Sequence, residues 1–459
     1  MEQNYQTNKT LGRKGKVFLI ILSFMIVCLL IFVVVGRTPA GNVPGTSHSI
    51  APTNSVSSPT VDPYGYTEMT LLSVGDIMFH NPQIRAGYNA TTQSYDFHDN
   101  FQYIKTLVSS ADLAVGNFEG TIAEQDFKGY PVFHLPIATL EAVKGAGFDV
   151  MLFANNHMYD NQKFGVQNTL TKFKELGFDY AGATLDTENE RACLIKEVNG
   201  IKIGIMNYAD SLTQDIVSSY TGELMHTING IVIQNDFFNN MNIYIQGQED
   251  AFYARVAEDM AYFKSQQVDI VVSYIHWGWE YFLEENEYQR QTAQKLCDMG
   301  VDVIIGSHPH VIQPMDTLVS TTDPTHSTLC FYSLGNYLSN QNRAADTWSK
   351  PAPAQGYSEN GLTVQLTIRR YNNGETVVSK LEYTPTWVHR YYQNGQLQYN
   401  ILPLPLTEDQ YESYGLTKSS HGISHSFESF QRTDSVMKED VAAFNQNAQE
   451  AIARLEGKA

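Results

Sequence analysis

The chain has 459 residues, of which 42% are hydrophobic and 17% are charged, with 49 acidic side chains against 30 basic ones. This length and apolar content suffice for one large or two modest folded domains and exclude a disordered chain. The net charge of −19 excludes nucleic acid as an expected partner, because binding to a phosphate backbone requires clustered Lys and Arg.

The first predicted element is a membrane-spanning helix at residues 17–35, a run of nineteen apolar or uncharged residues. Residues 1–16 carry four basic side chains, whereas only Arg37 lies close behind the run. The positive-inside rule therefore predicts a cytoplasmic basic tail at residues 1–16 and a main domain outside the cell. Because the run is long and lacks a cleavage-site pattern, we expect an uncleaved single-pass signal anchor in the cell membrane.

Residues 36–66 are rich in Gly, Pro, Ser and Thr, which is typical of a flexible linker. Residues 1–66 hold five basic and two acidic residues, so the exported remainder has 25 basic against 47 acidic side chains, a net charge of −22. Such a surface is expected to repel polyanions except at a local cationic site. The remainder has three Cys and no CxxC pattern, which predicts buried thiols.

From residue 67 to about residue 400, short apolar runs alternate with segments of helical spacing, which predicts an α/β domain. The predicted buried strands are residues 69–74, 113–115, 149–153, 201–206, 269–275, 301–305 and 329–332. The predicted helices are residues 137–146, 164–176, 250–265 and 288–299. Residues 211–248 are Asn-rich and weakly patterned, so we expect an insertion loop there.

The domain is expected to end in strands at residues 362–368 and 376–383, followed by a C-terminal extension at residues 401–459. In this extension apolar residues recur every three or four positions, from Met437 to Leu455, which predicts an amphipathic helix. Its other face is not basic, so a packing element is favoured over a membrane-binding one.

Each strong predicted strand ends in a polar cluster, and the clusters are residues 75–80, 116–120, 155–160, 276–281, 307–310 and 333–336. A single Asp after a strand is often a helix cap, and a single His is often a residue packed in the core or on the surface. In open α/β sheets, however, ligands bind beyond the carboxyl ends of the strands, so the clusters are expected to share one rim. Together, His, carboxylate and amide oxygen suit a divalent ion such as Mn, Fe or Zn. There are five or more candidate ligands, and two of them are carboxylates, which predicts two metal ions that share a bridging ligand. Enzymes use such a pair of ions for displacement reactions at phosphorus.

These motifs also carry a resemblance. The ordered set GDIMFH, GNFEG, FANNHMYD, IHWGWEY, GSHPHVIQ and YSLGNY resembles the CapA family, the poly-γ-glutamate capsule synthesis proteins, which is similar to calcineurin-like metallophosphoesterases. The match runs from about Met69 to Asn336 and on to about residue 400. It implies that residues 67–400 form a four-layer α/β sandwich, in a protein that is typically exported and membrane-anchored.

The resemblance further implies a dinuclear site, whose candidate ligands are Asp76, His80, Glu119, Asn156, His276, His308 and His310. Asp76 and His310 would bind one ion, and Glu119 would be the bridging carboxylate. His157 would be the general acid that protonates the leaving oxygen. The spacing from Asp76 to His80 departs from the Asp-x-His pattern of the broader superfamily, and Asn117 replaces its usual Asp.

Five residues are candidates for substrate contact: Asn117, Trp277, Glu280, Tyr332 and Asn336. Aromatic residues alternate with others just after His276, which fits either a hydrophobic wall or an apolar side of the substrate cleft. Both interpretations remain open from the sequence.

Three functions follow as hypotheses. The first, from the resemblance, is a membrane-anchored protein of capsule, poly-γ-glutamate or related envelope-polymer synthesis or export. The second, from the ligand chemistry, is an exported metal-dependent phosphoesterase acting on small or lipid-linked phosphate esters. The third is a non-catalytic scaffold subunit of a polymer synthase complex in the membrane. The expected substrate is an anionic polymer or a phosphate ester.

Overall fold

The computed structural model describes residues 65–210, 213–217, 224–234, 236–245, 247–343 and 356–457. These residues fall within one compact unit that begins at Val61. None of the helices in these ranges is both long and apolar enough to cross a membrane, and the predicted span at residues 17–35 lies outside them.

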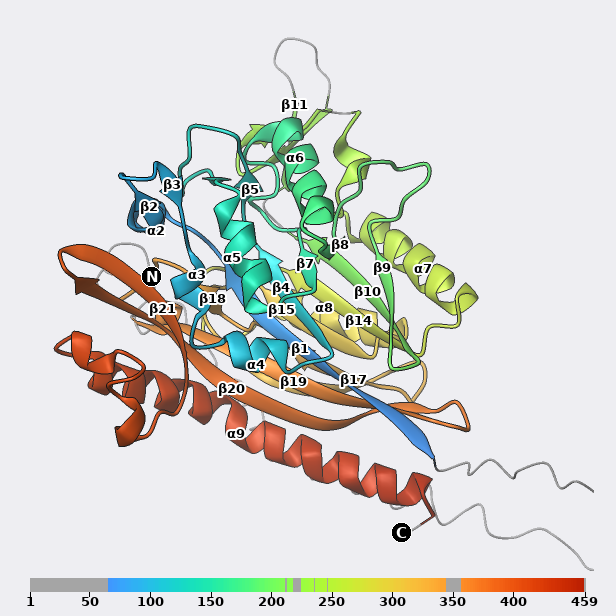
Figure 1. Ribbon diagram of the computed structural model, residues 1–459. Coiled ribbons are helices and arrows are strands. Elements are labelled where there is room, and N and C mark those ends of the chain that lie inside the picture. Colours follow the sequence, from blue (N-terminus) through green and yellow to red (C-terminus); the bar gives the residue numbers. More distant parts are fainter. Residues whose placement is uncertain are drawn as a thin grey trace, which may run out of the picture. The chain divides into compact units, whose positions relative to one another are not determined.

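Two mixed β-sheets form the centre of this unit (Figure 1). The first has the order β21-β20-β19-β1-β4-β7-β8, with β18 beside the end of β1. Strands β1, β4, β7 and β8 are parallel, and β19, β20 and β21 continue the sheet in antiparallel fashion. The bounds are β1 (Tyr66–Ile77), β4 (Leu113–Phe118), β7 (Val150–Leu152), β8 (Asp179–Ala181), β18 (Asn336–Leu338), β19 (Asn360–Tyr371), β20 (Thr376–Gln393) and β21 (Gln396–Pro403).

The second sheet has the order β16-β17-β15-β14-β10-β9. Its four inner strands are parallel, and β9 and β16 flank them in antiparallel fashion. The bounds are β9 (Leu194–Val198), β10 (Ile201–Ala209), β14 (Ile270–His276), β15 (Val303–Ser307), β16 (Met315–Val319) and β17 (Ser327–Phe331). The parallel strands read as continuous apolar runs because both of their faces are buried.

The two sheets pack face to face, and helices cover their outer faces. Leu71 and Val115 of the first sheet share one core with Ile205 and Val272 of the second. Ser73 Oγ and Tyr274 OH, one from each sheet, hydrogen-bond at 2.8 Å inside this core. The first sheet is covered by α2 (Asn81–Gly87), α3 (His98–Phe101), α4 (Lys105–Ser109), α5 (Ala138–Ala146) and α6 (Gln162–Glu175), and the second by α7 (Glu249–Ser265) and α8 (Glu287–Asp298).

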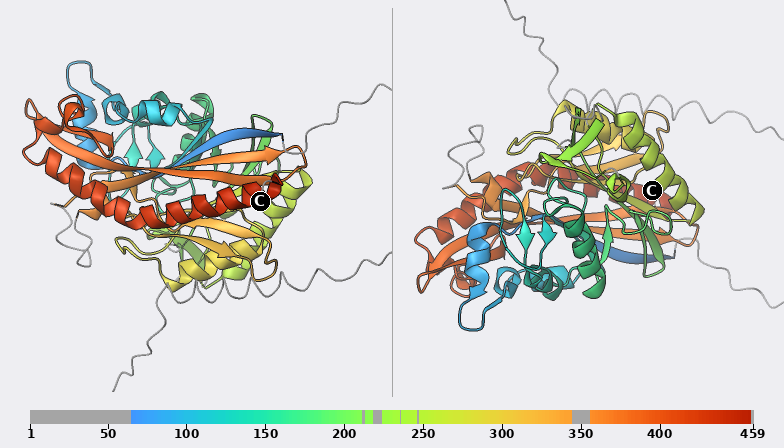
Figure 2. Two further views of the ribbon diagram at one scale, coloured as in Figure 1. Left: turned by 90° about the horizontal axis from the view of Figure 1, so that it is seen from below. Right: turned by 90° about the horizontal axis from the view of Figure 1, so that it is seen from above.

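The C-terminal helix α9 (Gly422–Leu455) lies along β20, as both views of Figure 2 show. Met437 and Val441 are buried in the inter-sheet core, and the Asn445 side chain exchanges two hydrogen bonds of 2.8 Å with the backbone of Leu381. The prediction of a packing helix is therefore confirmed, although the helix begins well before Met437.

The predicted strands and helices are all present, with shifts at their ends; the largest among the strands is in β20, which continues to Gln393 rather than ending at residue 383. The three predicted free thiols are buried. The predicted loop at residues 211–248 differs, because it contains a three-stranded sheet of β11 (Thr213–Val217), β12 (Leu224–Ile228) and β13 (Ile231–Val232). Asn229 (φ 48°) and Gly230 (φ 74°) join β12 to β13. An Asn-Gly pair with positive φ at both residues is the typical two-residue hairpin turn.

Candidate metal centre

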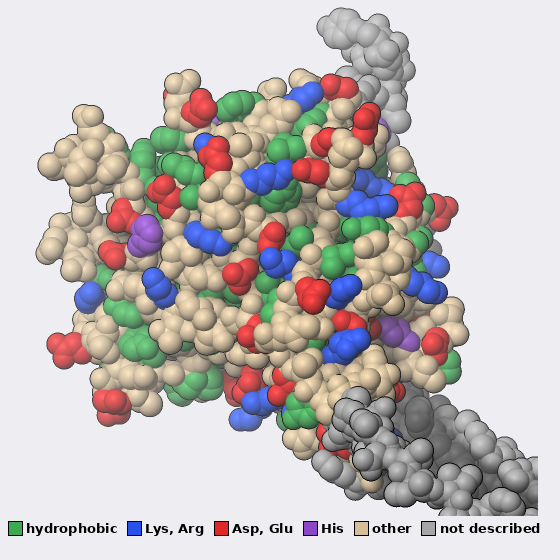
Figure 3. All heavy atoms as spheres, turned by 45° about the vertical axis from the view of Figure 1, so that its right-hand side comes forward, with side chains coloured by type: hydrophobic (Ala, Val, Ile, Leu, Met, Phe, Trp, Pro, Cys, Tyr) green, Lys and Arg blue, Asp and Glu red, His purple; other side chains and the backbone are tan. Residues whose placement is uncertain are grey.

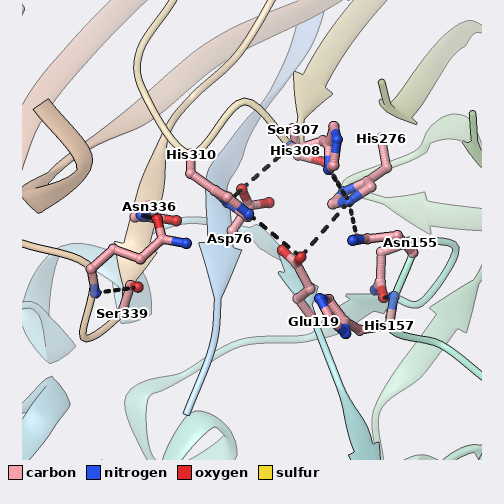
Figure 4. Close-up of polar contacts among 12 residues, drawn as sticks. Asp76, Glu119, Asn155, His157, His276, Ser307, His308, His310, Asn336 and Ser339 are labelled. Carbon is pink, nitrogen blue, oxygen red and sulfur yellow. Dashed lines mark hydrogen bonds and ion pairs between the residues drawn. The ribbon is translucent and has the colours of Figure 1, made fainter. Parts of the chain in front are cut away.

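The polar clusters predicted from the sequence meet at one rim, beyond the carboxyl ends of the parallel strands (Figure 4). In the first sheet, Asp76 near the end of β1 pairs in register with Asn117 on β4. In the second sheet, His276 at the end of β14 pairs with Ser307 at the end of β15. Because the sheets pack face to face, the ends of both parallel sets supply side chains to the same space.

Glu119 lies at the centre of this rim, just after β4. It is fully buried, and neither of its carboxylate oxygens has a hydrogen-bond partner among the described residues. Its Oε1 lies 3.8 Å from His276 Nε2 and 3.9 Å from His310 Nε2. Burial, followed by the charge of Asp76, raises the pKa of Glu119 well above its usual value. A buried carboxylate without a hydrogen-bond partner costs several kcal/mol, so this position favours a cation.

His276, Asn156 and His308 form one group of donors beside Glu119. His276 Nε2 lies 2.7 Å from Asn156 Oδ1 and 3.1 Å from His308 Nδ1. Two ligands of one ion, each at about 2.1 Å, lie roughly 3–3.5 Å apart. The two ring nitrogens have this separation, whereas the Asn156 oxygen lies closer to His276, at hydrogen-bond distance. Burial, followed by neighbouring His residues, lowers the pKa of His308 to about 3 and that of His276 well below its usual value. Both rings are therefore neutral, which is the form that binds metal.

Asp76 and His310 form a second group on the other side of Glu119. His310 Nδ1 lies 3.0 Å from Asp76 Oδ2, and Asn117 Nδ2 donates to Asp76 Oδ1 at 2.8 Å. Burial lowers the pKa of His310, but the charges of Glu119 and Asp76 outweigh it and raise the pKa to about 9. A proton on His310 thus offsets part of the local negative charge, which a bound cation would offset more fully. Asp76, Glu119 and His310 could hold a metal ion together.

The loop after β15 has an unusual backbone that brings both of its histidines to the rim. His308 has a φ of 95° and His310 a φ of 56°, and the backbone N–H of His308 donates to Asp76 Oδ2 at 3.3 Å. Positive φ is costly for residues other than Gly and persists where the surroundings enforce it, commonly at functional sites. Near the end of β15, a Cβ on Gly306 would lie 2.0 Å from the carbonyl oxygen of Tyr332, so only Gly fits.

Ser307 and Asn155 support the ligands, and the sequence reasoning had assigned them no role. Ser307 Oγ lies 2.9 Å from His276 Nδ1, which leaves Nε2 of that ring facing Glu119. Asn155 Nδ2 donates to the carbonyl of Phe118, and its Oδ1 accepts from the backbone N–H of His157. A partner such as Ser307 fixes the ring orientation of a metal-binding His, whereas Asn155 fixes the backbone beside Asn156 and His157. Both residues stand inside the motifs, but which atom each one meets depends on the tertiary structure.

His157 is held in place by Asp160 and Phe133. Its Nδ1 lies 2.8 Å from Asp160 Oδ2, and its ring makes an edge contact with Phe133 at 4.6 Å between centroids. Asp160 Oδ2 also accepts from the backbone N–H of Phe133 at 2.6 Å. This arrangement leaves Nε2 of His157 available to a substrate. Asp160 follows His157 by three residues in the sequence. This spacing alone does not predict a hydrogen bond between the two side chains.

A cleft of about 510 Å³ opens beside the rim, and its lining consists of Met78, His80, Tyr130, Phe133, His157, Glu280, Tyr281, His310, Asn340 and Gln341. His80 lies at the N-terminus of α2, and its Nδ1 accepts from the Asn340 N–H at 3.4 Å. Burial, followed by the charge of His310, lowers the pKa of His80 to about 3. Among the described residues His80 belongs to neither group of possible metal ligands, whereas Glu280 joins His308 and His310 in one.

The other candidates for substrate contact are not part of the cleft lining. Trp277 is fully buried, donates from Nε1 to the carbonyl of Tyr332 at 2.9 Å and stacks on its ring at 6.1 Å between centroids. These two residues therefore form a hydrophobic wall behind the site. Asn336 is also buried, and its Nδ2 donates to Ser358 O and Gln341 Oε1, both at 2.9 Å. Asn117 lies under the rim and contacts Asp76 rather than open space.

Comparison with known proteins places these residues in context. A family model described as "Bacterial capsule synthesis protein PGA_cap" matches residues 70–341. The chain is 29% identical over 280 residues to "Capsule biosynthesis protein CapA" of Bacillus anthracis, covering 60% of this chain and 60% of that relative. It is 25% identical over 339 residues to "PGA biosynthesis protein CapA" of Bacillus subtilis (strain 168), covering 72% and 75%.

Solved structures show weaker similarity. One is a hypothetical protein from Thermus thermophilus, at 14% identity and a TM-score of 0.37, covering 73% of this chain and 100% of that one. Another is the calcineurin-like phosphoesterase YfkN from Bacillus subtilis, at 12% identity and a TM-score of 0.34, covering 70% and 91%.

Proposed function

Because the chain belongs to the family of bacterial capsule synthesis proteins called PGA_cap, we propose that it serves the synthesis or export of an envelope polymer through metal-dependent hydrolysis of a phosphate ester. Two relatives carry names of capsule and PGA biosynthesis, which supports a polymer such as poly-γ-glutamate. The chain spans 60% of the first of these relatives, so its substrate and its partners are part of the proposal.

The observation that carries the proposal is the environment of Glu119. This carboxylate is buried without a hydrogen-bond partner among the described residues, and imidazole nitrogens of His276 and His310 lie 3.8 and 3.9 Å away on either side. We propose that it bridges two divalent ions, one held with Asp76 and His310, the other with the donors around His276. A site with imidazole, carboxylate and amide oxygen suits Mn, Fe or Zn.

When bound, such a pair of ions stabilises the attacking and leaving oxygens of a displacement at phosphorus. This donor set is also the reason to assign the chain to the calcineurin-like metallophosphoesterases. The protein side chains supply the proton: His157 presents Nε2 to the cleft while Asp160 holds Nδ1. Hydrolysis breaks the bond from phosphorus to the leaving oxygen and forms one to the oxygen of water. His157 donates the proton that the leaving oxygen gains, the attacking water gives up a proton to solvent, and His157 is reprotonated from solvent.

The test is hydrolysis of p-nitrophenyl phosphate by the purified protein with and without Mn²⁺. We expect Mn²⁺-dependent activity that falls by at least about 100-fold in His157→Ala, because a general acid contributes that much. His98→Ala is the matched control, because His98 is exposed and its side chain pairs with Asp96 on the surface. Absence of Mn²⁺-dependent hydrolysis in the wild type would refute the phosphoesterase proposal. Full activity in His157→Ala would refute the assignment of the acid.

We further propose that residues 17–35 anchor the protein in the cell membrane and that the metal centre faces outward. Two features of the sequence support this topology: the apolar run itself and the excess of basic residues before it. A membrane synthase complex for the polymer is the proposed partner. Protease treatment of intact cells tests the topology: an N-terminal tag should stay protected while a C-terminal tag is lost. Loss of both tags or of neither would contradict it.

A further inference from the structure

The lining of the cleft differs in charge from other parts of the surface. On the face drawn in Figure 3, Lys and Arg side chains are interspersed with Asp and Glu. None of the ten residues that line the cleft is Lys or Arg. The lining has one carboxylate, that of Glu280, which is exposed and lies close enough to His308 and His310 to share a metal ion with them. Apart from protonated histidine, the lining therefore offers a substrate no positive charge of its own.

The loop that carries Glu280 is fixed in place by several hydrogen bonds. The backbone N–H of Tyr281 donates to Pro309 O at 2.7 Å. The buried side chain of Gln313 donates to the carbonyls of Phe282 and Glu284 at 2.9 and 3.0 Å. The backbone from Tyr281 to Glu284 is tied to its neighbours, so the segment that follows Glu280 is fixed beside the loop of His308 and His310.

The remaining lining suits an uncharged group with a ring. Met78, Phe133 and Tyr281 provide apolar surface, and Asn340 and Gln341 provide amide groups. Tyr130 lies at the edge of the cleft with 64% of its surface exposed. Its segment is anchored on Asn81, which donates to Tyr130 O and accepts from the Gly129 N–H. A large aromatic side chain held exposed on a fixed loop is suited to contact with a flat, uncharged ligand.

We propose that the substrate is a phosphate ester with an uncharged, ring-bearing leaving group, and that Glu280 discriminates against esters that carry further negative charge. This inference rests on the proposed function for the binding of the phosphate itself. It implies that a free polyanion such as poly-γ-glutamate is not the occupant of the cleft. The Coulomb energy between Glu280 and a substrate grows with the charge of the substrate, so discrimination should increase with each added anionic group.

The test compares two esters that differ by a single charge, phenyl phosphate and 4-carboxyphenyl phosphate, with the Mn²⁺-loaded protein. We expect kcat/KM to favour phenyl phosphate by about tenfold or more, and Glu280→Gln to reduce this ratio to about threefold or less. Glu284→Gln is the matched control, because Glu284 is an exposed carboxylate of the same loop outside the cleft lining. A change in metal occupancy cancels in the ratio, because both esters are measured with the same variant.

Binding of phenylphosphonate and 4-carboxyphenylphosphonate, measured by calorimetry, separates this inference from the proposed function. Neither compound can be hydrolysed, so the preference is measurable even in a protein without catalytic activity. A preference for phenylphosphonate that is lost in Glu280→Gln and kept in Glu284→Gln supports the inference, whatever the hydrolytic activity. Equal binding of both phosphonates, or an equal effect of the two substitutions, overturns it, even if the protein hydrolyses phosphate esters.

Discussion

His157 Nδ1 lies 2.8 Å from Oδ2 of Asp160, and both side chains are almost completely buried. The same carboxylate oxygen accepts the backbone N–H of Phe133, whose ring packs edge-on against His157. The imidazole is therefore held by a hydrogen bond and by an aromatic neighbour. This relationship gives His157 one orientation, with Nε2 as the nitrogen available to the cleft.

Replacing Asp160 by Asn should weaken catalysis without removing the metal site. An amide in this position can present N–H instead of oxygen to Nδ1, which favours the wrong tautomer of His157. We expect kcat for p-nitrophenyl phosphate to fall by about 10- to 1,000-fold at unchanged Mn²⁺ content. Asp236→Asn, an exposed surface carboxylate, is the control. Wild-type kcat in Asp160→Asn, measured by steady-state kinetics, would show that the contact does not position the acid.

Ser307→Ala should weaken metal binding. Ser307 Oγ is the partner of His276 Nδ1, and loss of such a partner typically lowers metal affinity by about 10- to 100-fold. Ser273→Ala provides the control, because Ser273 lies on the same strand as His276 and its buried hydroxyl has no partner among the described residues. Titration with Mn²⁺ followed by calorimetry measures both. Equal affinities in the two variants would contradict the role of Ser307.

Asp210→Asn should stabilise the protein at neutral pH. Asp210 is 3% exposed, and neither of its carboxylate oxygens has a partner among the described residues. Burial, followed by the charge of Glu249, raises its pKa well above the usual value. The native state thus holds this proton more tightly than the unfolded chain, and the free energy of unfolding decreases as pH rises above about 4.

The Asn variant does not titrate, so we expect it to exceed the wild type by about 1–3 kcal/mol at pH 7.5, with the difference vanishing toward pH 4. Urea unfolding of the two metal-free proteins across this pH range measures the effect. A difference that is independent of pH, or a less stable variant at pH 7.5, would contradict the assignment of an unpaired buried charge.

Much of the candidate site could be predicted because the parallel strands end together. Asp76, Glu119 and His276 each follow an apolar run, and strands that end at one rim bring such residues together whatever the details of packing. Asp160 and Ser307 could not be assigned roles, because a hydrogen bond to a ring nitrogen depends on the orientation of that ring. The spacing of residues within a motif does not specify the orientation of the ring.

Two other differences have local causes. The aromatic alternation after His276 is interrupted at Gly278, which has a φ of 86°. Trp277 consequently enters the core, while 56% of the Trp279 surface is exposed. The hairpin of β12 and β13 was detectable from its Asn229–Gly230 turn, but β13 has only two residues and β12, with the sequence LMHTI, does not alternate apolar and polar residues.

The central claim is that Glu119 bridges two ions, and the most direct test is the Mn²⁺ content per chain after equilibrium dialysis. Glu119→Gln keeps the shape of the side chain and removes the charge. The account predicts about two ions per wild-type chain and at most about one in the variant, because a neutral amide is a poor bridging ligand. Less than one ion in the wild type, or equal content in both proteins, would contradict it.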